Sequence, residues 1–213
     1  MKNSKKSLDI HREIKIHKKK LSNCRLCKNM KGTPVICSNS SSDILLIGQA
    51  PGIKEKVINK PFAWTAGKNL FSWFYKIDVS EDNFRKNVYM ASICRCYPGK
   101  NLKSSGDRVP SIEEINNCKQ WLDFEINILK PKLIIPVGKL AIEKFISFQK
   151  LHEVVGKKFT KKVNGISLNI ICLPHPSGIS MWYKKNPGKA LLEESLFKIH
   201  KTKVWQKLIS KEK

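Results

Sequence analysis

The sequence predicts an α/β protein, a single-domain α/β/α sandwich with a central, mainly parallel four-stranded sheet. Short apolar runs bounded by turn residues alternate along the chain with segments whose apolar residues recur at helical spacing. This alternation is typical of parallel strands joined by crossover helices that cover both faces of a sheet. The length of 213 residues suits one such domain and is too short for two ordinary ones.

Three segments are expected along the chain. Residues 1–22 predict a basic N-terminal helix or arm with only a ragged apolar stripe, and residues 23–200 predict the main domain. Residues 201–213 predict the basic C-terminal tail of a last helix that begins near Lys189.

Four apolar segments predict the strands. Residues 44–47 are apolar at every position, which is typical of a strand buried on both faces of a parallel sheet. A polar stretch precedes this run and the loop GQAPG follows it, so both of its ends are marked by turn residues. The other three strands are predicted within residues 87–96, 133–138 and 167–178.

Helices are predicted between these strands. Apolar residues recur at helical spacing in residues 66–77. Ser111 and Glu114 predict a capping box at the start of a helix that runs to about Leu129. A further helix is predicted over residues 138–148.

Charge indicates the class of partner. The chain has 41 Lys and Arg against 17 Asp and Glu, a formal net charge of +24. So many positive charges repel one another in the compact state, and their excess favours a polyanionic partner. Nucleic acid is favoured ahead of an anionic membrane. The alternative is a general enrichment in lysine that spreads charge over every solvated face without functional meaning.

The chain contains no run of about 18 apolar residues, and its N-terminal segment has no apolar core of signal-peptide length. We therefore expect a cytoplasmic protein with no membrane partner, acting as a monomer. Seven cysteines in a reducing compartment are expected to include metal ligands rather than to form a disulfide framework.

Cys24 and Cys27 form a CxxC motif, which fits a redox, zinc or cluster site. Cys94, Cys96 and Cys118 lie at predicted loops or strand ends, and two of them can complete a set of four thiolates. Zinc and a 4Fe-4S cluster both accept four thiolates, so the donor set alone does not choose between them. The apolar neighbours of Cys37, Cys94 and Cys172 favour these three as small buried side chains.

Two loops at predicted carboxyl ends of strands, where α/β proteins bind ligands, carry candidate functional residues. In GQAPG, glycines permit close approach of the backbone to a ligand, although a tight structural turn also explains them. In His175-Pro176-Ser177, the imidazole can donate to a developing negative charge and the serine can bind phosphate or cap a turn.

In combination, these motifs resemble a known family. The order CxxC, strand, GQAPG, KPF, a cysteine at a strand end, a second cysteine on a helix, and HPSG is similar to the bacterial and archaeal uracil-DNA glycosylases that carry a 4Fe-4S cluster. The resemblance spans roughly residues 20–200. Residues 96–142 are similar to the second cluster-binding loop and the following strand of family 5.

The resemblance implies a structural 4Fe-4S cluster, a DNA substrate containing uracil or another deaminated base, and hydrolysis of the N-glycosidic bond to leave an abasic site. It places Cys94 outside the cluster, and it implies that Lys184 or Lys185 extends the contact with phosphates. The implied cluster ligands are Cys24, Cys27, Cys96 and Cys118. The implied site residues are His175 as donor to uracil O2, Gln49 as the group that orients water, Gly48, Ala50 and Phe62 around the base, Ser92 at the base-reading position, and Ser177 and Gly178 on phosphates.

The chain departs from this family at three positions. Gln49 stands where family 4 has Glu, Thr65 where family 5 tends to have Asp, and Ser92 where family 4 has Asn. An amide can orient water but cannot accept its proton, and Glu55 lies only a few residues from Gln49. The missing carboxylate favours one alternative, a non-catalytic iron-sulfur protein that binds or senses damaged DNA. A second alternative, in which the four cysteines hold zinc, is a zinc-stabilised nucleic-acid-binding protein unrelated to repair.

Overall fold

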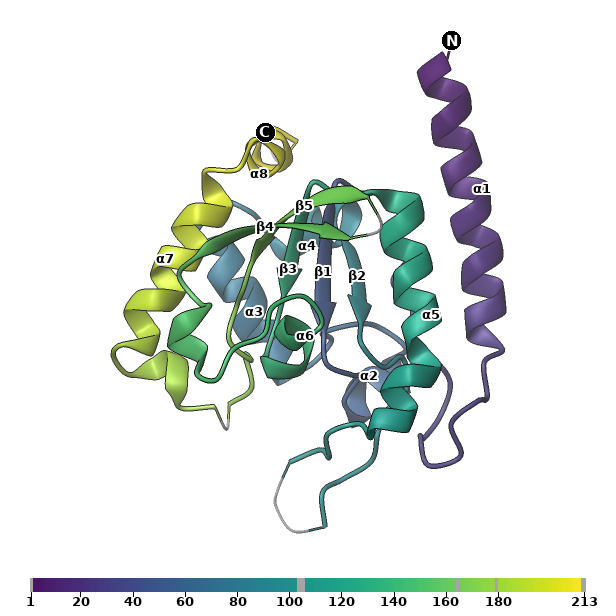
Figure 1. Ribbon diagram of the computed structural model, residues 1–213, viewed down its shortest axis with the longest axis horizontal. Coiled ribbons are helices and arrows are strands. Elements are labelled where there is room, and N and C mark those ends of the chain that lie inside the picture. The colour runs from purple at the N-terminus through teal and green to yellow at the C-terminus, as the bar shows by residue number, and fades with distance from the viewer. Residues whose placement is uncertain (1, 103–105, 164, 179, 212–213) are drawn as a thin grey trace.

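The computed structural model describes residues 2–102, 106–163, 165–178 and 180–211. A sheet with the strand order β2-β1-β3-β5-β4 forms the centre of the molecule, and helices cover both of its faces (Figure 1). The α/β class predicted from the sequence is confirmed. The strands are β1 (Ile44–Gly48), β2 (Tyr89–Ser92), β3 (Leu133–Pro136), β4 (Lys158–Val163) and β5 (Ile166–Ile171).

Strand β1 lies between β2 and β3 and is parallel to both. All five of its residues are buried, as its continuous apolar sequence predicts for a strand covered on both faces. Leu46 pairs with Met90 of β2 and with Ile135 of β3. The carboxyl ends of these three parallel strands therefore lie at the same end of the sheet.

The sheet has five strands, so the prediction of four was wrong in this detail. The additional strand, β4, is antiparallel to β5 and lies at the edge of the sheet. Its sequence, KFTKKV, is rich in lysine. Charged side chains are common on edge strands because they discourage pairing with another chain. The same lysines leave β4 without the apolar run from which the other strands were predicted.

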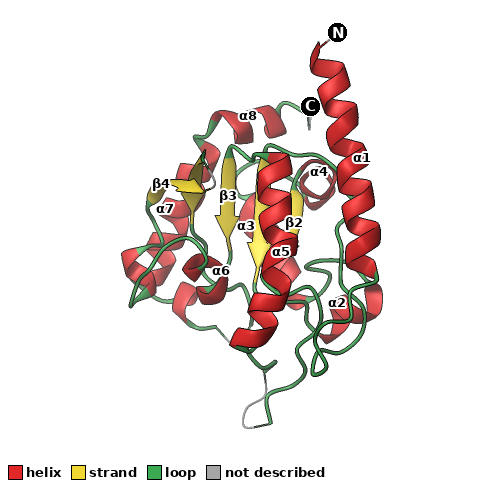
Figure 2. Cartoon of the chain, turned by 45° about the vertical axis from the view of Figure 1, so that its right-hand side comes forward, coloured by secondary structure: helices red, strands yellow, loops and turns green. Residues whose placement is uncertain are grey.

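The helices form two layers. In Figure 2, α5 and α6 lie in front of the sheet and α3 and α4 lie behind it. Among the described residues, no helix is long and apolar enough to cross a membrane. The helices are α1 (Lys2–Ser22), α2 (Ile53–Ile58), α3 (Thr65–Tyr75), α4 (Glu81–Asn87), α5 (Ile112–Leu129), α6 (Lys139–Glu143), α7 (Gly188–His200) and α8 (Lys203–Ile209).

Helix α5 begins and ends as the sequence predicts. Ser111 caps its first turn, and Glu114 completes the capping box. Lys130 follows the last turn in a left-handed conformation, directly before Pro131. Helix α6 is shorter than the predicted segment 138–148, because only Lys139–Glu143 is helical.

Helix α1 packs along α5 through a buried polar network (Figure 1). His17 Nε2 of α1 lies 3.1 Å from Glu125 Oε1 of α5, and Tyr89 donates a hydrogen bond of 2.8 Å to the same oxygen. Arg95 forms an ion pair with the other carboxylate oxygen of Glu125. The N-terminal helix is therefore attached to the main domain by a buried hydrogen bond as well as by apolar contact.

Candidate functional site

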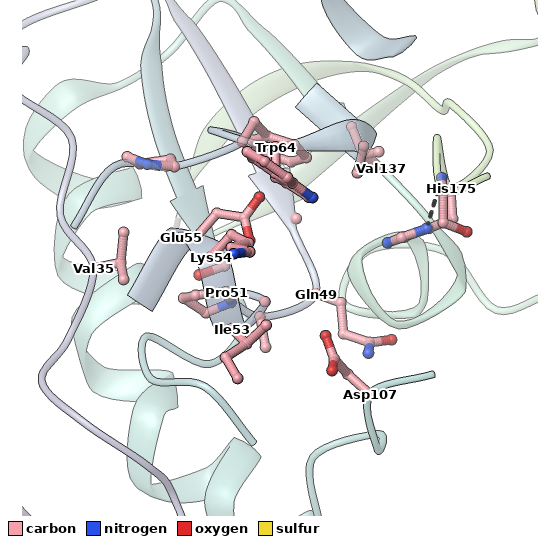
Figure 3. Close-up of a pocket in the computed structure, with 18 of the residues that line it drawn as sticks. Val35, Gln49, Pro51, Ile53, Lys54, Glu55, Trp64, Asp107, Val137 and His175 are labelled. Carbon is pink, nitrogen blue, oxygen red and sulfur yellow. Dashed lines mark hydrogen bonds between the residues drawn. The ribbon is translucent and has the colours of Figure 1, made fainter. Parts of the chain in front are cut away.

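A cavity of about 430 Å³ opens at the carboxyl ends of β1 and β2 (Figure 3). Segments that are distant in sequence form its wall, among them the GQAPG loop, the turn before α3, the end of β2, the loop around residue 107, and the loop after β5. The predicted site residues that line it are Gly48, Gln49, Ala50, Phe62, Ser92, His175 and Ser177.

The GQAPG loop is fixed to the chain that continues from β2. The N–H of Ile93 donates to the carbonyl of Gly48, and the N–H of Cys94 donates to that of Gln49, both at 3.0 Å. A side-chain carbon at Gly48 would lie only 2.9 Å from Cζ of Phe62. Glycine at this position therefore lets the Phe62 ring lie directly against the end of β1.

Phe62 is held by its backbone. It has a positive φ of 50°, and a side-chain carbon at Gly67 would lie 1.8 Å from its carbonyl oxygen. Arg85 of α4 donates hydrogen bonds of 2.9 Å to the carbonyls of Pro61 and Phe62. The turn thus depends on a glycine that leaves space and on an arginine that satisfies two carbonyl groups.

His175 lies in the loop after β5, against the cavity. The N–H of Ser177 donates to its Nδ1 at 3.2 Å, which leaves the proton of the neutral ring on Nε2. Burial lowers the pKa of His175, and the negative charge of Asp107 opposes that shift. At neutral pH the imidazole is therefore an uncharged hydrogen-bond donor.

Ser92 lies at the end of β2 and lines the cavity. Its hydroxyl donates to the carbonyl of Cys94 at 2.7 Å. Because its hydrogen is committed to the protein, the hydroxyl oxygen is left as an acceptor. Such a group can accept a hydrogen bond from an N–H of a ligand but cannot donate one to a carbonyl.

Two carboxylates, Glu55 and Asp107, face the GQAPG loop, and Asp107 was not among the residues predicted from the sequence. A side-chain carbon at Gly52 would lie 3.3 Å from Asp107 Oδ2 and 2.7 Å from Glu55 Oε2. Figure 3 shows Asp107 pointing toward Gln49. Tyr97 donates to Asp107 Oδ1 at 3.1 Å. No local pattern marked Asp107, because it lies in a long loop between two predicted cysteine ligands.

The loop after His175 is braced by side chains from other elements. Asn69 of α3 donates to the carbonyl of Pro176 at 2.8 Å, and Tyr183 donates to that of Ser177 at 3.3 Å. Gly178 does not line the cavity, and its carbonyl accepts a hydrogen bond of 3.4 Å from Lys184. Lys184 thus lies beside the predicted phosphate contacts.

A second, smaller cavity of about 70 Å³ is lined by four cysteines. They are the predicted cluster ligands Cys24, Cys27, Cys96 and Cys118, brought together from the end of α1, the loop after it, the chain beyond β2, and α5. Among the described residues, no three His, Cys, Asp or Glu side chains converge closely enough to hold a single metal ion. The four thiols surround a space instead.

Two features of the four-cysteine cavity fit a bound metal group. Burial and the neighbouring thiols raise the pKa of Cys96 to about 12, a sign that four thiolates without a cation would repel one another. Arg95 Nε and Trp121 Nε1 are buried without a hydrogen-bond partner among the described residues, and both side chains line this cavity. Sulfur atoms of a bound cluster are acceptors for such donors.

The other three cysteines lie outside this cavity. Cys37, Cys94 and Cys172 are buried, as their apolar neighbours predict. A hydrogen bond from Cys94 lowers the pKa of Cys118, so Cys94 supports the thiolate form of a neighbouring cysteine.

Comparison with known proteins identifies the family. A family model described as the uracil DNA glycosylase superfamily matches residues 35–209. A Type-4 uracil-DNA glycosylase of Pyrobaculum aerophilum is 27% identical over 141 residues, 64% of this chain and 67% of the relative. One of Archaeoglobus fulgidus is 27% identical over 176 residues, 80% of this chain and 81% of the relative. A Type-5 uracil-DNA glycosylase of P. aerophilum is 26% identical over 142 residues, 60% of this chain and 55% of the relative.

The range matched by the family model contains every loop that forms the larger cavity. It also contains Cys96 and Cys118, whereas Cys24 and Cys27 precede it. The resemblance inferred from the motifs is confirmed. Because the match covers most of its length, the chain belongs to the uracil-DNA glycosylase superfamily.

Proposed function

We propose that this protein is a DNA repair glycosylase that binds an extruded uracil in the larger cavity and hydrolyses its N-glycosidic bond. The proposal rests on one observation: Phe62, a neutral His175 and the carboxylate of Asp107 line the same cavity at the carboxyl ends of the strands. A surface that only binds DNA does not require these three groups in one place.

His175 is proposed to stabilise the leaving group. Cleavage of the bond places negative charge on the base, and a fixed donor at uracil O2 opposes that charge more strongly in the transition state than in the ground state. The hydrogen bond from Ser177 to Nδ1 keeps the Nε2 proton available for this purpose. Phe62 is proposed to stack on the base, and Ser92 to accept its N–H.

Asp107 is proposed to orient the attacking water and accept its proton, with the amide of Gln49 as a second contact. A carboxylate can take the proton that an amide cannot. Asp107 is preferred to Glu55 because it points toward Gln49 and because its charge acts on His175 (Figure 3). A negative charge there also stabilises the positive charge that develops on the sugar.

Binding energy must offset the cost of extruding the base, a few kcal/mol of lost stacking and pairing. We propose that contacts of basic side chains with phosphates supply much of it, in keeping with the net charge of +24. Ser177, Gly178 and Lys184 are the proposed phosphate contacts beside the cavity.

A 4Fe-4S cluster is the proposed occupant of the four-cysteine cavity, with Cys24, Cys27, Cys96 and Cys118 as ligands. When bound, it would supply structural cohesion between the end of α1 and α5. Visible absorbance tests this, because a 4Fe-4S protein is brown and zinc thiolates are colourless. A colourless, folded protein that contains one equivalent of zinc would contradict the proposal.

The test of function is incubation of the purified holoprotein with labelled single- and double-stranded oligonucleotides that contain one uracil, followed by alkali. Strand breakage at the uracil is the expected result, and it should be lost in His175→Ala and strongly reduced in Asp107→Asn. Parallel substrates with hypoxanthine or xanthine report on other deaminated bases. Tight binding without breakage of any substrate would overturn the proposal and identify a non-catalytic damage sensor.

A further inference from the structure

The rim of the larger cavity carries an aromatic side chain that the reaction does not use. Trp64 lines the cavity directly before α3, and its side chain is 48% exposed. Its carbonyl accepts a hydrogen bond from the N–H of Lys68 in the first turn of α3, so its backbone is fixed. A large ring held at an opening to solvent is an uncommon place for tryptophan, which usually buries most of its surface.

Two lysines flank this ring. Lys54 Nζ lies 5.0 Å from the ring centroid and Lys68 Nζ lies 6.0 Å from it. Lys54 belongs to α2, a helix that has no buried residue, so packing does not fix its side chain. The rim therefore combines an aromatic face with two cations within reach of it.

We propose that Trp64 stacks on the nucleobase next to the extruded nucleotide, while Lys54 and Lys68 contact the adjoining phosphates. An aromatic face beside basic side chains is the combination by which proteins hold unpaired bases and their backbone. The inference rests on the proposed function for the identity of the extruded nucleotide. It adds a second base-binding subsite, which takes any base because every base has a flat face.

The subsite matters most for single-stranded DNA. In a duplex, the base next to the extruded nucleotide keeps its pairing and one stacking neighbour. In a single strand that base is free to move onto the indole. We therefore expect Trp64 to contribute more to single-stranded than to double-stranded substrates.

The test compares Trp64→Ala with Trp64→Phe on oligonucleotides in which either neighbour of the uracil is replaced by an abasic analogue. Binding is measured in the His175→Ala background, where DNA stays intact. Loss of the indole should weaken binding to single-stranded DNA by about 5- to 150-fold, and phenylalanine should restore most of it. With catalytic His175 present, Trp64→Ala should raise KM and leave kcat nearly unchanged.

The substrate variants identify the contact. Removing one neighbouring base should weaken binding to the protein that retains Trp64, and it should have little further effect on Trp64→Ala. Phe197→Ala is the matched control, because Phe197 is 55% exposed and lies 5.3 Å from Lys201 Nζ but does not line the cavity. This control should bind normally.

Two results would overturn the inference: unchanged binding by Trp64→Ala, or an equal penalty for the missing neighbour base with and without the indole. Failure of the proposed function gives a different result. In that case the protein that retains His175 cleaves no uracil substrate, while the comparison of intact and abasic neighbours still reports whether Trp64 stacks on a base.

Discussion

Arg85 connects helix α4 to the turn that carries Phe62. Its guanidinium lies 4.4 Å from the Phe71 ring centroid, and it donates to the carbonyls of Pro61 and Phe62 and to Glu81. A planar fork of donors is suited to this task, and a lysine cannot reproduce it. Arg85 is therefore a positioning residue that acts through Phe62.

Replacement of Arg85 by alanine should lower kcat/KM for uracil-containing DNA by about 100-fold, because small displacements of a group that positions the substrate have effects of this size. Steady-state kinetics would measure the loss, and the Arg85→Lys variant should recover only part of it. A thermal melt of each variant separates misplacement of Phe62 from unfolding. Unchanged kcat/KM in a folded Arg85→Ala protein would refute the positioning role.

The protonation of His175 depends on its neighbours in a testable way. Burial holds the pKa below the ordinary value of 6.5, and the charge of Asp107 raises it part of the way back. Asp107→Asn removes that charge, so the His175 titration should move to lower pH, as followed by NMR of the imidazole. A movement to higher pH would mean that Asp107 does not act on His175.

The same shift affects stability. The unfolded chain binds a proton near pH 6.5, whereas folded His175 does so only at lower pH. The contribution of this group to the free energy of unfolding is therefore fully present above pH 6.5 and decreases as the pH falls toward the folded pKa.

At the scale of elements, the junction of α1 and α5 depends on a buried charge. Burial opposes ionisation of Glu125, but Arg95 and His17 outweigh it, so the pKa of this carboxyl lies below its usual range. Removing one partner of a buried ion pair leaves the other charge unpaired. Glu125→Gln should therefore lower the free energy of unfolding by about 3–5 kcal/mol, measured by urea denaturation.

The surface pair Lys132–Asp43 provides the control. Its oxygen and nitrogen are 2.8 Å apart, but both side chains are largely exposed. Asp43→Asn should change the free energy of unfolding by less than about 1 kcal/mol. Equal effects of the two substitutions would show that the network at Glu125 is not a special source of stability.

The elements differ in how far their sequences predict them. The capping box at the start of α5 and Pro131 just after its end are local signals, and they predicted both of its ends. Strand β4 was missed because its pairing with β5, rather than apolar content, makes it a strand. Asp107 was missed for the same reason: only the folded loop brings it opposite Gln49. Local signals predicted most elements and motifs, whereas features that depend on contacts between distant segments could not be predicted from them.

At the scale of the whole molecule, the net charge of +24 has two explanations, and salt dependence separates them. If lysines around the cavity neutralise phosphates, binding releases counterions and the affinity falls steeply with salt. Six or more such contacts would weaken binding by about 1,000-fold or more between about 50 and 200 mM salt. A general enrichment in lysine predicts no dependence on which lysine is removed.

Individual lysines therefore decide between the two explanations. Lys54→Ala and Lys68→Ala, at the rim of the cavity, should each reduce the slope of log affinity against log salt by about 1. Lys207→Ala is the control, because α8 lies at the end of the sheet opposite α2 (Figure 1). Fluorescence anisotropy over a salt series would measure all three slopes. Equal slopes for the three variants would mean that DNA is attracted by the overall charge of the molecule and not by a defined path that leads to the cavity.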